Sequence, residues 1–451
     1  MDTESTMTWD GSAGDARRIA MVSTHGYVGA EPPLGAADTG GQVVYVLELS
    51  KKLAQLGYEV DIWTRQFEDQ VATEWVAPGV RVLRAPCGGR DFIPKEYLHR
   101  SLGEWCTQAL KRIQAEGLQY AFLNSHYWDA GVAGERLCDV LAIPHLHTPH
   151  SLGIWKQRQM VRDYPGDSGA FERTYNFAVR NHNELRIAAQ AELVIATSPD
   201  QIEVLRGDYD VAAQKLVAIP PGYDDTRFYP VGGESRELLR RKFGFQGKVI
   251  LALGRIARNK GYDLLLQAFA HVAAREPEAR LHLAIGGQRL QPAEQALLED
   301  WRRLAAELGV SERVSFSGFV PDAEMADLYR AADVFVLSSR YEPFGMTAVE
   351  AMACGTPVVV TTHGGLCRVL RFGVDGLFAD TFDAMDLAIT ILKPLQFPRL
   401  AARLSRRGAE AARRHFTWTG VTQQLIEAAR NRAEPCDRAE SKSRVRWAQS
   451  S

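Results

Sequence analysis

The sequence predicts an α/β fold with doubly wound parallel sheets in two separate units, and three observations predict it. Short apolar segments alternate with stretches that carry apolar residues at helical spacing, which is typical of parallel sheets. The segment PPGYDDTRFYP at 220–230, rich in Pro, Gly and Asp, interrupts this alternation. A second alternation follows, and each half has about 200 residues, enough for an independent core.

The first half opens on the apolar segment 18–24, and the helix after it, 40–56, ends at Gly57. The strands predicted in this half are 18–24, 58–64, 81–85, 120–125, 143–148, 193–197 and 215–220. The helices predicted between them are 40–56, 95–116, 131–141, 181–190 and 199–206.

The second half repeats the pattern after the interruption. Its predicted strands are 248–254, 280–287, 313–318, 333–339 and 356–361, and its helices are 261–274, 293–308, 322–331 and 346–353. We therefore expect a flexible tail at 1–17, an N-terminal domain at 18–228 and a C-terminal domain at 229–414. A helix at 415–430 is expected to pack back across the junction, and a flexible tail at 431–451 to follow it.

Composition excludes several functional classes. The formal net charge is −2, which argues against a nucleic-acid or anionic-membrane binder. Apolar residues make up 46% and charged residues 24%, as in globular proteins. No apolar run reaches the roughly 18 residues of a membrane span. The N-terminus lacks a secretory h-region, and the 6 Cys form no C-x-x-C pair, so we expect reduced thiols and a cytoplasmic protein.

Ligands of parallel sheets bind beyond the carboxyl ends of the strands, so polar residues there are the candidates. Gly40, Gly41 and Gln42 follow the first strand and open a helix, where a phosphate can bind; an ordinary turn is the alternative. No G-x-G-x-x-G motif supports a dinucleotide site. Asp208-Tyr209-Asp210 has the D-x-D form of a metal–diphosphate site but is interpreted as a turn.

The second half has two charged motifs at strand ends. Arg255 and Lys260 follow the strand 248–254, where a diphosphate would stabilise two cations near a helix start. Glu342 and Glu350 follow the strand 333–339, and in one continuous helix they would lie about 12 Å apart along the axis. A retaining glycosidase needs its carboxyls about 5–5.5 Å apart, so this pair suits two parts of an elongated ligand instead.

Histidines and cations gather at strand ends of the first half. A zinc site is one interpretation of His145, His147 and His150. No acidic or Cys ligand lies at a matching interval, so a polar or acid–base role is favoured. The loops and helices of this half also contain cations that together can hold a phosphate: Lys95, Lys156, Arg158 and Arg180.

These motifs resemble those of the retaining glycosyltransferases of family four. In the second half the resemblance rests on Gly254-Arg255 with Lys260 and on the run EPFGMTAVE at 342–350. In the first half, DTGGQ at 38–42, HY at 126–127, DAG at 129–131 and HSLG at 150–153 narrow it to the sucrose-phosphate synthase-like branch. The resemblance implies the GT-B fold, in which two Rossmann-like domains face each other across a cleft.

The resemblance also implies roles for individual residues. The residues implied to bind the donor are Gly41, Gln42, Arg255, Lys260, Phe344, Gly345, Met346, Thr347 and Glu350. Those implied to bind the acceptor are Gln42, Lys95, His126, Tyr127, Ser151, Lys156 and Arg180. Those implied to be catalytic are His150, Arg255, Lys260 and Glu342.

The resemblance implies a hexosyltransferase that moves mannose from GDP-mannose to fructose 6-phosphate. Mg²⁺ or Mn²⁺ would accompany the nucleotide sugar rather than belong to the protein. The residues alone leave open a sucrose-phosphate synthase that uses UDP-glucose, or a sugar-nucleotide sensor without catalysis. No second carboxylate stands out as a nucleophile, so we expect front-face transfer with retention, in which the departing phosphate takes the acceptor's proton.

Overall fold

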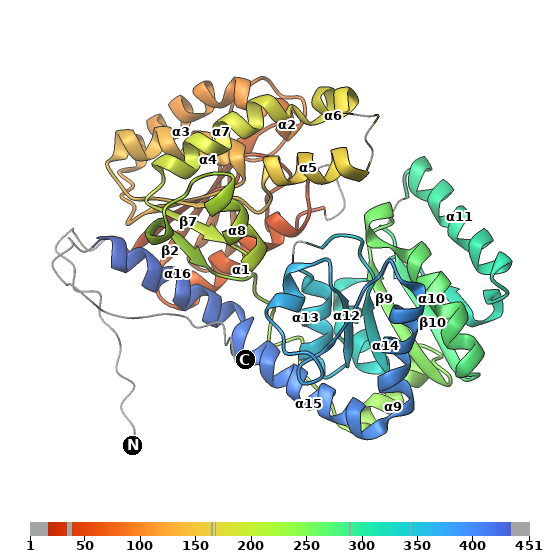
Figure 1. Ribbon diagram of the computed structural model, residues 1–451. Coiled ribbons are helices and arrows are strands. Elements are labelled where there is room, and N and C mark those ends of the chain that lie inside the picture. Colours follow the sequence, from red (N-terminus) through yellow and green to blue (C-terminus); the bar gives the residue numbers. More distant parts are fainter. Residues whose placement is uncertain are drawn as a thin grey trace, which may run out of the picture. The chain divides into compact units, whose positions relative to one another are not determined.

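The structure is a computed structural model that describes residues 17–33, 38–163, 166, 168–287, 290–342 and 344–433. The chain divides into two compact units (Figure 1). The first unit comprises the chain up to Thr197, Gln201–Ile219 and the chain from Thr422. The second comprises Ser198–Asp200 and Pro220–Val421. The tail predicted at 1–17 lies, except for Arg17, outside the described residues.

The first unit is built on an eight-stranded sheet whose order is β3-β4-β2-β1-β5-β6-β7-β8. Its strands are β1 (Arg18–Val22), β2 (Glu59–Gln66), β3 (Thr73–Ala77), β4 (Val80–Pro86), β5 (Leu123–His126), β6 (His145–Thr148), β7 (Leu193–Ala196) and β8 (Leu216–Ala218). All neighbours pair in parallel except β3, which runs antiparallel to β4 at the edge. The parallel alternation predicted from the sequence is confirmed.

Helices connect these strands. They are α1 (Gly41–Gln55), α2 (Lys95–Leu98), α3 (Leu102–Glu116), α4 (Trp128–Leu141), α5 (Gly153–Asp163), α6 (Ser168–Tyr175), α7 (Phe177–Gln190), α8 (Pro199–Gly207) and α16 (Trp418–Ala433). The 3₁₀ turns of this unit are η1 (His99–Ser101) and η2 (Ala213–Lys215). A core forms where α3 and α4 pack on the sheet, with Trp63 of β2 against Trp105 of α3 at a ring distance of 6.4 Å.

The second unit is built on a six-stranded parallel sheet in the order β11-β10-β9-β12-β13-β14. Its strands are β9 (Lys248–Gly254), β10 (Ala279–Ile285), β11 (Val314–Phe316), β12 (Val334–Leu337), β13 (Val358–Thr361) and β14 (Leu377–Ala379). Successive strand residues enter different cores: Val334 and Val336 join one cluster, and Phe335 and Leu337 join the other. The sheet is therefore buried on both faces.

Helices cover both faces of this second sheet. They are α9 (Gly233–Lys242), α10 (Tyr262–Arg275), α11 (Pro292–Glu307), α12 (Asp322–Ala331), α13 (Met346–Ala353), α14 (Ala384–Gln396) and α15 (Pro398–His415), with the 3₁₀ turns η3 (Arg258–Lys260), η4 (Ser311–Arg313) and η5 (Gly365–Arg368). Helices α10, α11 and α14 supply one core, and α12 and α13 supply the other. Two doubly wound sheets of this kind confirm the predicted pair of Rossmann-like domains.

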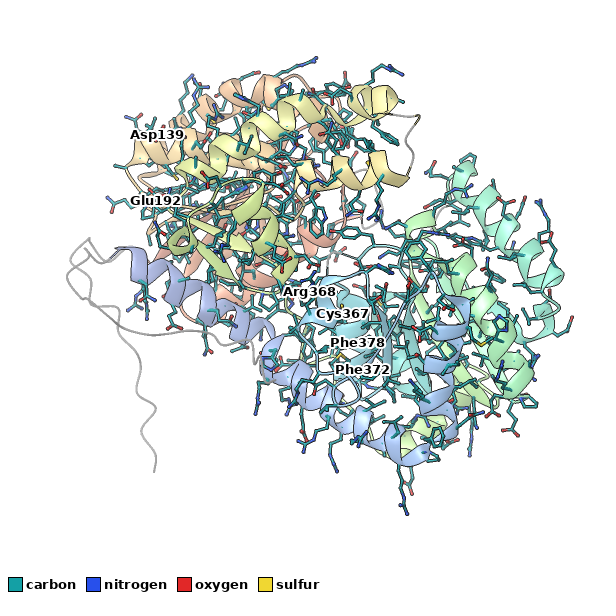
Figure 2. All side chains as sticks on the ribbon, viewed as in Figure 1. Asp139, Glu192, Cys367, Arg368, Phe372 and Phe378 are labelled. Carbon is teal, nitrogen blue, oxygen red and sulfur yellow. The ribbon has the colours of Figure 1, made fainter. Side chains whose placement is uncertain are left out.

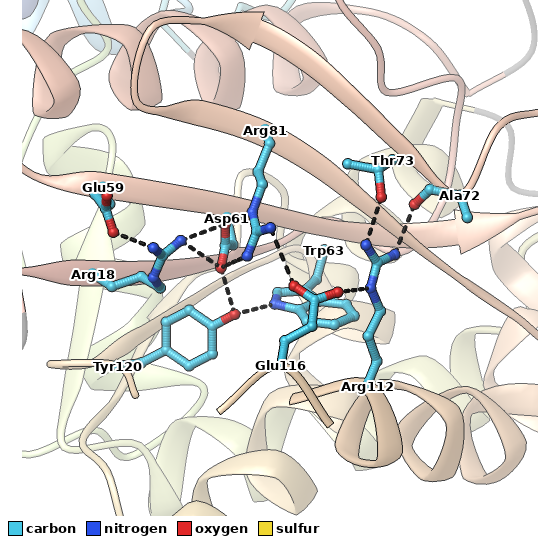
Figure 3. Close-up of polar contacts among 10 residues, drawn as sticks. All are labelled: Arg18, Glu59, Asp61, Trp63, Ala72, Thr73, Arg81, Arg112, Glu116 and Tyr120. Carbon is cyan, nitrogen blue, oxygen red and sulfur yellow. Dashed lines mark hydrogen bonds and ion pairs between the residues drawn. The ribbon is translucent and has the colours of Figure 1, made fainter. Parts of the chain in front are cut away.

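A buried carboxylate ties the amino ends of the strands of the first unit together (Figure 3). Asp61 of β2 is fully buried and accepts hydrogen bonds from Arg81 Nε at 2.6 Å, Arg18 Nη1 at 3.1 Å and the Tyr120 hydroxyl at 2.8 Å. Arg81 also pairs with Glu116 of α3 at 3.1 Å. A buried charge is tolerated when it is paired and fully hydrogen-bonded, and here the pairing joins three strands to a helix.

Several elements differ from the sequence-based prediction. The strands β3 and β14 and the helices α5, α6, α9 and α14 were not predicted. The C-terminal helix predicted at 415–430 begins at Trp418 and continues to Ala433, so the tail predicted from residue 431 starts at least three residues too early. From Thr422 this helix belongs to the first unit.

The described cysteines are free thiols: Cys87, Cys106, Cys138, Cys354 and Cys367. All but Cys367 are buried; Cys367 lies on η5 beside Arg368 (Figure 2), and its Sγ donates to the Gly364 carbonyl at 3.0 Å. Cys436 lies outside the described residues. Among the described helices, none has the length and apolar character to cross a membrane.

Gly222 packs closely against Trp418, the first residue of α16. A Cβ at this position would lie 2.9 Å from the Cα of Trp418 and 2.5 Å from its ring. We expect Gly222→Ala to destabilise the protein by about 1–3 kcal/mol through overpacking. The melting temperature, followed by circular dichroism, should fall by about 2–4 °C for each kcal/mol.

The matched control is Gly233→Ala at the first position of α9, where an added Cβ meets nothing within 4 Å. Its effect should stay within about 0.5 kcal/mol. Equal melting temperatures for the two variants would contradict the close packing of Gly222 on Trp418.

Candidate functional site

Helix α1 starts at the carboxyl edge of the first sheet. Its N-cap, Gly40, has no side chain to accept a hydrogen bond from the first turn, and that turn has no acidic residue. A Cβ on Gly40 or Gly41 would meet nothing within 4 Å, so the backbone at these two residues is not covered on that side. Gln42 Nε2 donates to Ser23 Oγ and to the His126 carbonyl, each at 3.2 Å. The site thus has uncapped amide donors, as an anion requires.

Lys95 is held beside this helix by Asp38. Its Nζ forms an ion pair with Asp38, and its backbone N–H donates to Asp38 Oδ2 at 3.1 Å. Burial disfavours the charge of Lys95, but the Asp38 carboxylate outweighs burial and raises the lysine pKa. Asn176 Nδ2 donates to the Glu96 carbonyl at 3.1 Å, which ties this segment to the start of α7.

Arg180 of α7 is a fully buried cation with a defined partner. Its Nε donates to Glu184 Oε1 at 2.7 Å, and its Nη2 donates to the Ser151 carbonyl at 2.9 Å and to Ser151 Oγ at 3.1 Å. The guanidinium lies 4.8 Å from the centre of the Tyr127 ring. Burial opposes its charge, but Glu184 outweighs burial and raises the pKa of Arg180. Arg180 therefore stays charged at neutral pH.

Lys156 of α5 completes a cation cluster, by which we mean Lys95, Lys156 and Arg180. Burial, together with the charges of Arg180 and Lys95, lowers the pKa of Lys156 to about 8, although the nearby carboxylates of Glu96 and Asp38 act in the opposite direction. Its Nζ lies 3.9 Å from the centre of the Tyr175 ring. The structure thus brings these predicted acceptor-binding cations into electrostatic contact, together with Ser151 and Tyr127.

His126 and His150 form a pair at the carboxyl ends of β5 and β6. His126 Nδ1 lies 2.9 Å from His150 Nε2. His126 is completely buried, whereas His150 is half-buried. His126 therefore lies behind His150 rather than on an open surface. The predicted contact of His126 with an acceptor stays a prediction.

A histidine–aspartate pair was not predicted either. His25, directly after β1, has its Nδ1 2.9 Å from both carboxylate oxygens of Asp129, and the Thr24 hydroxyl donates to Asp129 Oδ2 at 2.6 Å. The His25 ring packs edge-on to Tyr127 at 5.0 Å. The sequence signal was present, because His25 ends a predicted strand just as His126 does.

In the second unit, Lys260 and Glu342 are brought together. Lys260 Nζ donates to Glu342 Oε2 at 2.7 Å, and Ser339 Oγ donates to the same oxygen at 2.9 Å. Gly261 has φ +64° and lies against the backbone of β12's end, where a Cβ would sit 2.2 Å from the Ser338 carbonyl. Only glycine permits this approach, which holds Lys260 beside the carboxyl edge of the sheet.

Arg255 lies near the same edge but is exposed. Burial and the charge of Glu342 raise the pKa of Tyr262. Arg255 is close enough to act in the opposite direction on this phenol. The backbone of Glu342 is tied to the end of β13, because its N–H donates to the His363 carbonyl at 3.2 Å and its carbonyl accepts from Gly365 N–H at 3.1 Å.

Helix α13 starts beside this pair. Its N-cap Gly345 has φ +107°, no acidic residue occupies the first turn, and Met346 and Thr347 are its first residues. Phe344 is buried against Phe416 at a ring distance of 5.5 Å. The backbone N–H groups here can bind an anion.

Glu350 lies further along α13. Its Oε2 accepts a hydrogen bond from the Tyr329 hydroxyl at 2.9 Å, and burial raises the pKa of Glu350 to about 7. Glu342 and Glu350 thus have different partners, as expected if they meet different parts of one ligand.

The described residues do not fit a resident metal ion. No group of three or more His, Cys, Asp or Glu side chains among them can hold one. The ring nitrogens His145 Nε2 and His147 Nδ1 each lie 2.8 Å from Ser125 Oγ, within hydrogen-bond distance. The backbone N–H of His145 donates to the Glu192 carboxylate (Figure 2) at 2.7 Å. Asp208 of the Asp208-Tyr209-Asp210 segment forms an ion pair with Arg158 at 2.7 Å.

Two family models match the two halves of the chain. Residues 39–227 match the family described as Glycosyltransferase Family 4, and residues 235–411 match Glycosyl transferases group 1. The matches cover the cation cluster in the first half and the Lys260–Glu342 pair in the second.

Named relatives span almost the whole chain. A mannosylfructose-phosphate synthase from Agrobacterium fabrum is 60% identical over 92% of this chain and 91% of its own. A D-inositol 3-phosphate glycosyltransferase from Corynebacterium jeikeium is 34% identical over 90% of this chain and 95% of its own. The solved structure of a sucrose-phosphate synthase from Thermosynechococcus elongatus is 30% identical with a TM-score of 0.77, and the match covers 92% of this chain and 98% of that one.

Proposed function

Because the chain belongs to the family 4 glycosyltransferases and is a hexosyltransferase with the GT-B fold, we propose that it transfers mannose from GDP-mannose to fructose 6-phosphate. The products are mannosylfructose phosphate and GDP. The relative at 60% identity carries the name of this reaction, and at that identity over 92% of the chain the binding residues are expected to be shared.

The cation cluster carries the acceptor half of the proposal. Lys95, Lys156 and Arg180 converge from three elements, and two of them depress the pKa of the third. Cations crowded together in this way are stabilised when an anion binds among them. A phosphorylated sugar supplies that anion, and the names of all three relatives include a phosphate.

The donor half of the proposal rests on the second unit. Lys260, Arg255 and the N-terminus of α13 would stabilise negative charge on the departing diphosphate, which grows as the anomeric C–O bond breaks. Glu350 would bind the nucleotide ribose, and Glu342 the hexose. Since Glu342 Oε2 already accepts two hydrogen bonds, we propose it as a binding group rather than a nucleophile.

Transfer is proposed to proceed with retention. The acceptor hydroxyl attacks on the face from which the diphosphate leaves, and the leaving phosphate oxygen takes the hydroxyl proton. Each of these steps uses groups of the protein and the substrates, and Mg²⁺ or Mn²⁺ would accompany the nucleotide sugar rather than be held by the protein. A covalent glycosyl-enzyme trapped on Glu342 would contradict this mechanism.

A donor–acceptor panel tests the proposal. The purified chain is given GDP-mannose or UDP-glucose, each with fructose 6-phosphate, with fructose or with no acceptor, and the product is analysed by NMR. We expect turnover only with GDP-mannose and fructose 6-phosphate, and a product with the anomeric configuration of the donor. Preference for UDP-glucose indicates a sucrose-phosphate synthase, and binding without turnover indicates a sensor; either contradicts the proposal.

Removal of the Lys260 charge should slow transfer. We expect Lys260→Ala to lower kcat/KM by about 10²-fold, because a preorganised cation at the leaving group is lost. The matched control is Lys248→Ala, since Lys248 makes an ion pair of the same length, 2.7 Å, with Glu276 at the amino end of β9. Equal rates for the two variants would remove Lys260 from the mechanism.

The low pKa of Lys156 predicts a pH dependence. The protonated amine binds phosphate, and with a pKa of about 8 it is charged at pH 7 and mostly neutral at pH 9. The KM for fructose 6-phosphate should therefore rise about tenfold between pH 7 and pH 9, while the KM for GDP-mannose should not follow it. Lys156→Arg, which stays charged, should flatten the profile; an unchanged rise in this variant would assign the titration to another group.

A further inference from the structure

The His126–His150 pair leaves one nitrogen of each ring unused. The 2.9 Å contact joins His126 Nδ1 to His150 Nε2. Among the described residues, His126 Nε2 is buried without a hydrogen-bond partner, and no group bonds His150 Nδ1. Tyr45 of α1 packs on both rings, at 5.7 Å from His126 and 4.9 Å from His150. The pair is therefore fixed in position, with a free nitrogen at each end.

Both rings are neutral at physiological pH. Burial and, to a smaller extent, the nearby His25 together lower the pKa of His150 to about 3. Burial also lowers the pKa of His126 well below its usual value, with added contributions from His150 and His147. Each neutral ring carries one N–H, and a hydrogen bond between the rings requires one proton between Nδ1 and Nε2.

Two arrangements of protons satisfy this requirement. If His150 Nε2 carries the proton, His126 must carry its own on Nε2, where a buried N–H would have no acceptor. If His126 Nδ1 carries it, His126 Nε2 is a bare lone pair, and His150 carries its proton on Nδ1. In folded proteins, a buried N–H without an acceptor is rarer than a buried acceptor without a donor. The second arrangement is therefore favoured.

The backbone also holds His150 in place. Its φ is +56°, an uncommon value for a residue other than glycine. Gln201 Nε2 donates to the His150 carbonyl at 3.2 Å, while Gln201 Oε1 accepts from the Thr197 N–H at 2.9 Å. Strained backbone that is held by surrounding bonds is typical of functional positions.

We propose that His126 is a positioning residue that fixes His150 as the Nδ1–H tautomer, so that His150 presents a neutral N–H donor to a hydroxyl oxygen of the transferred hexose. The ligand half of this statement rests on the proposed function; the tautomer does not. A neutral donor can orient the sugar without placing positive charge beside the oxocarbenium-like transition state, where a cation would be repelled.

The tautomer can be measured without any substrate. The full chain is labelled with ¹⁵N-histidine, and long-range ¹H–¹⁵N correlations are recorded at pH 7. The His150 signals are assigned by their loss in His150→Gln. We expect both His126 and His150 to have a protonated Nδ1 and a bare Nε2. A protonated Nε2 on either ring, or an imidazolium, overturns the proposal whatever the substrates of the enzyme are.

Kinetics then test whether the tautomer matters. In His126→Asn the side-chain amide can still donate to His150 Nε2, whereas in His126→Leu nothing donates. We expect His126→Leu to lower kcat about tenfold or more with little change in the KM for fructose 6-phosphate, and His126→Asn to stay within about threefold of the wild type. Equal losses in both variants would contradict a positioning role.

The matched control is His145→Asn. It breaks another buried histidine bond at this sheet, the one to Ser125, without touching His150. Its kcat should remain close to that of the wild type once the melting temperatures show that each variant is folded. A loss as large as that of His126→Leu would indicate general loosening of the strands and would overturn the proposal.

Discussion

The parallel register of the two sheets is the constraint on which the other features depend. Because every strand of a parallel sheet ends at the same edge, residues far apart in the sequence meet there. In the first unit, the register pairs His126 with Thr148, which places His150, two residues further on, within 2.9 Å of the His126 ring. In the second unit, the ends of β9 and β12 bring Lys260 to Glu342. The opposite edge serves stability instead, since Asp61 and its arginines join the strands near their amino ends.

Charge is distributed in a consistent way around the candidate site. Arg180 is buried and Lys95 and Glu350 are partly buried, and each has a counter-ion or a hydrogen-bond partner: Glu184 for Arg180, Asp38 for Lys95 and Tyr329 for Glu350. Lys156 differs, because its neighbours include two cations and its pKa falls. Groups whose ionisation is perturbed by both burial and specific neighbours are concentrated at functional sites. The site is thus prepared for an anion while the free protein avoids unpaired buried charge.

The sequence predicted the fold and much of the site because both depend on local patterns. Short, nearly continuous apolar segments such as 248–254 predict buried strands. Polar residues directly after such a segment mark the carboxyl end of the strand. The edge strand β3 was missed, since an antiparallel strand with exposed residues such as Trp75 lacks the continuous apolar run of a buried one. The His25–Asp129 and His126–His150 pairs were missed for a different reason. Asp129 lies on α4 and His150 lies two residues beyond β6, and nothing in the sequence of one strand specifies how these separate elements are placed against it.

The first unit is assembled from two distant parts of the chain, because residues from Thr422 onward in α16 belong to it. This has a consequence for biosynthesis. During translation, everything up to Ile219 emerges early, yet the last helix of that unit is made only after the whole of the second unit. The second unit can therefore complete its core first, reversing the usual order in which N-terminal domains fold before later ones. A premature stop codon just before Thr422 would leave the earlier-made half permanently one helix short.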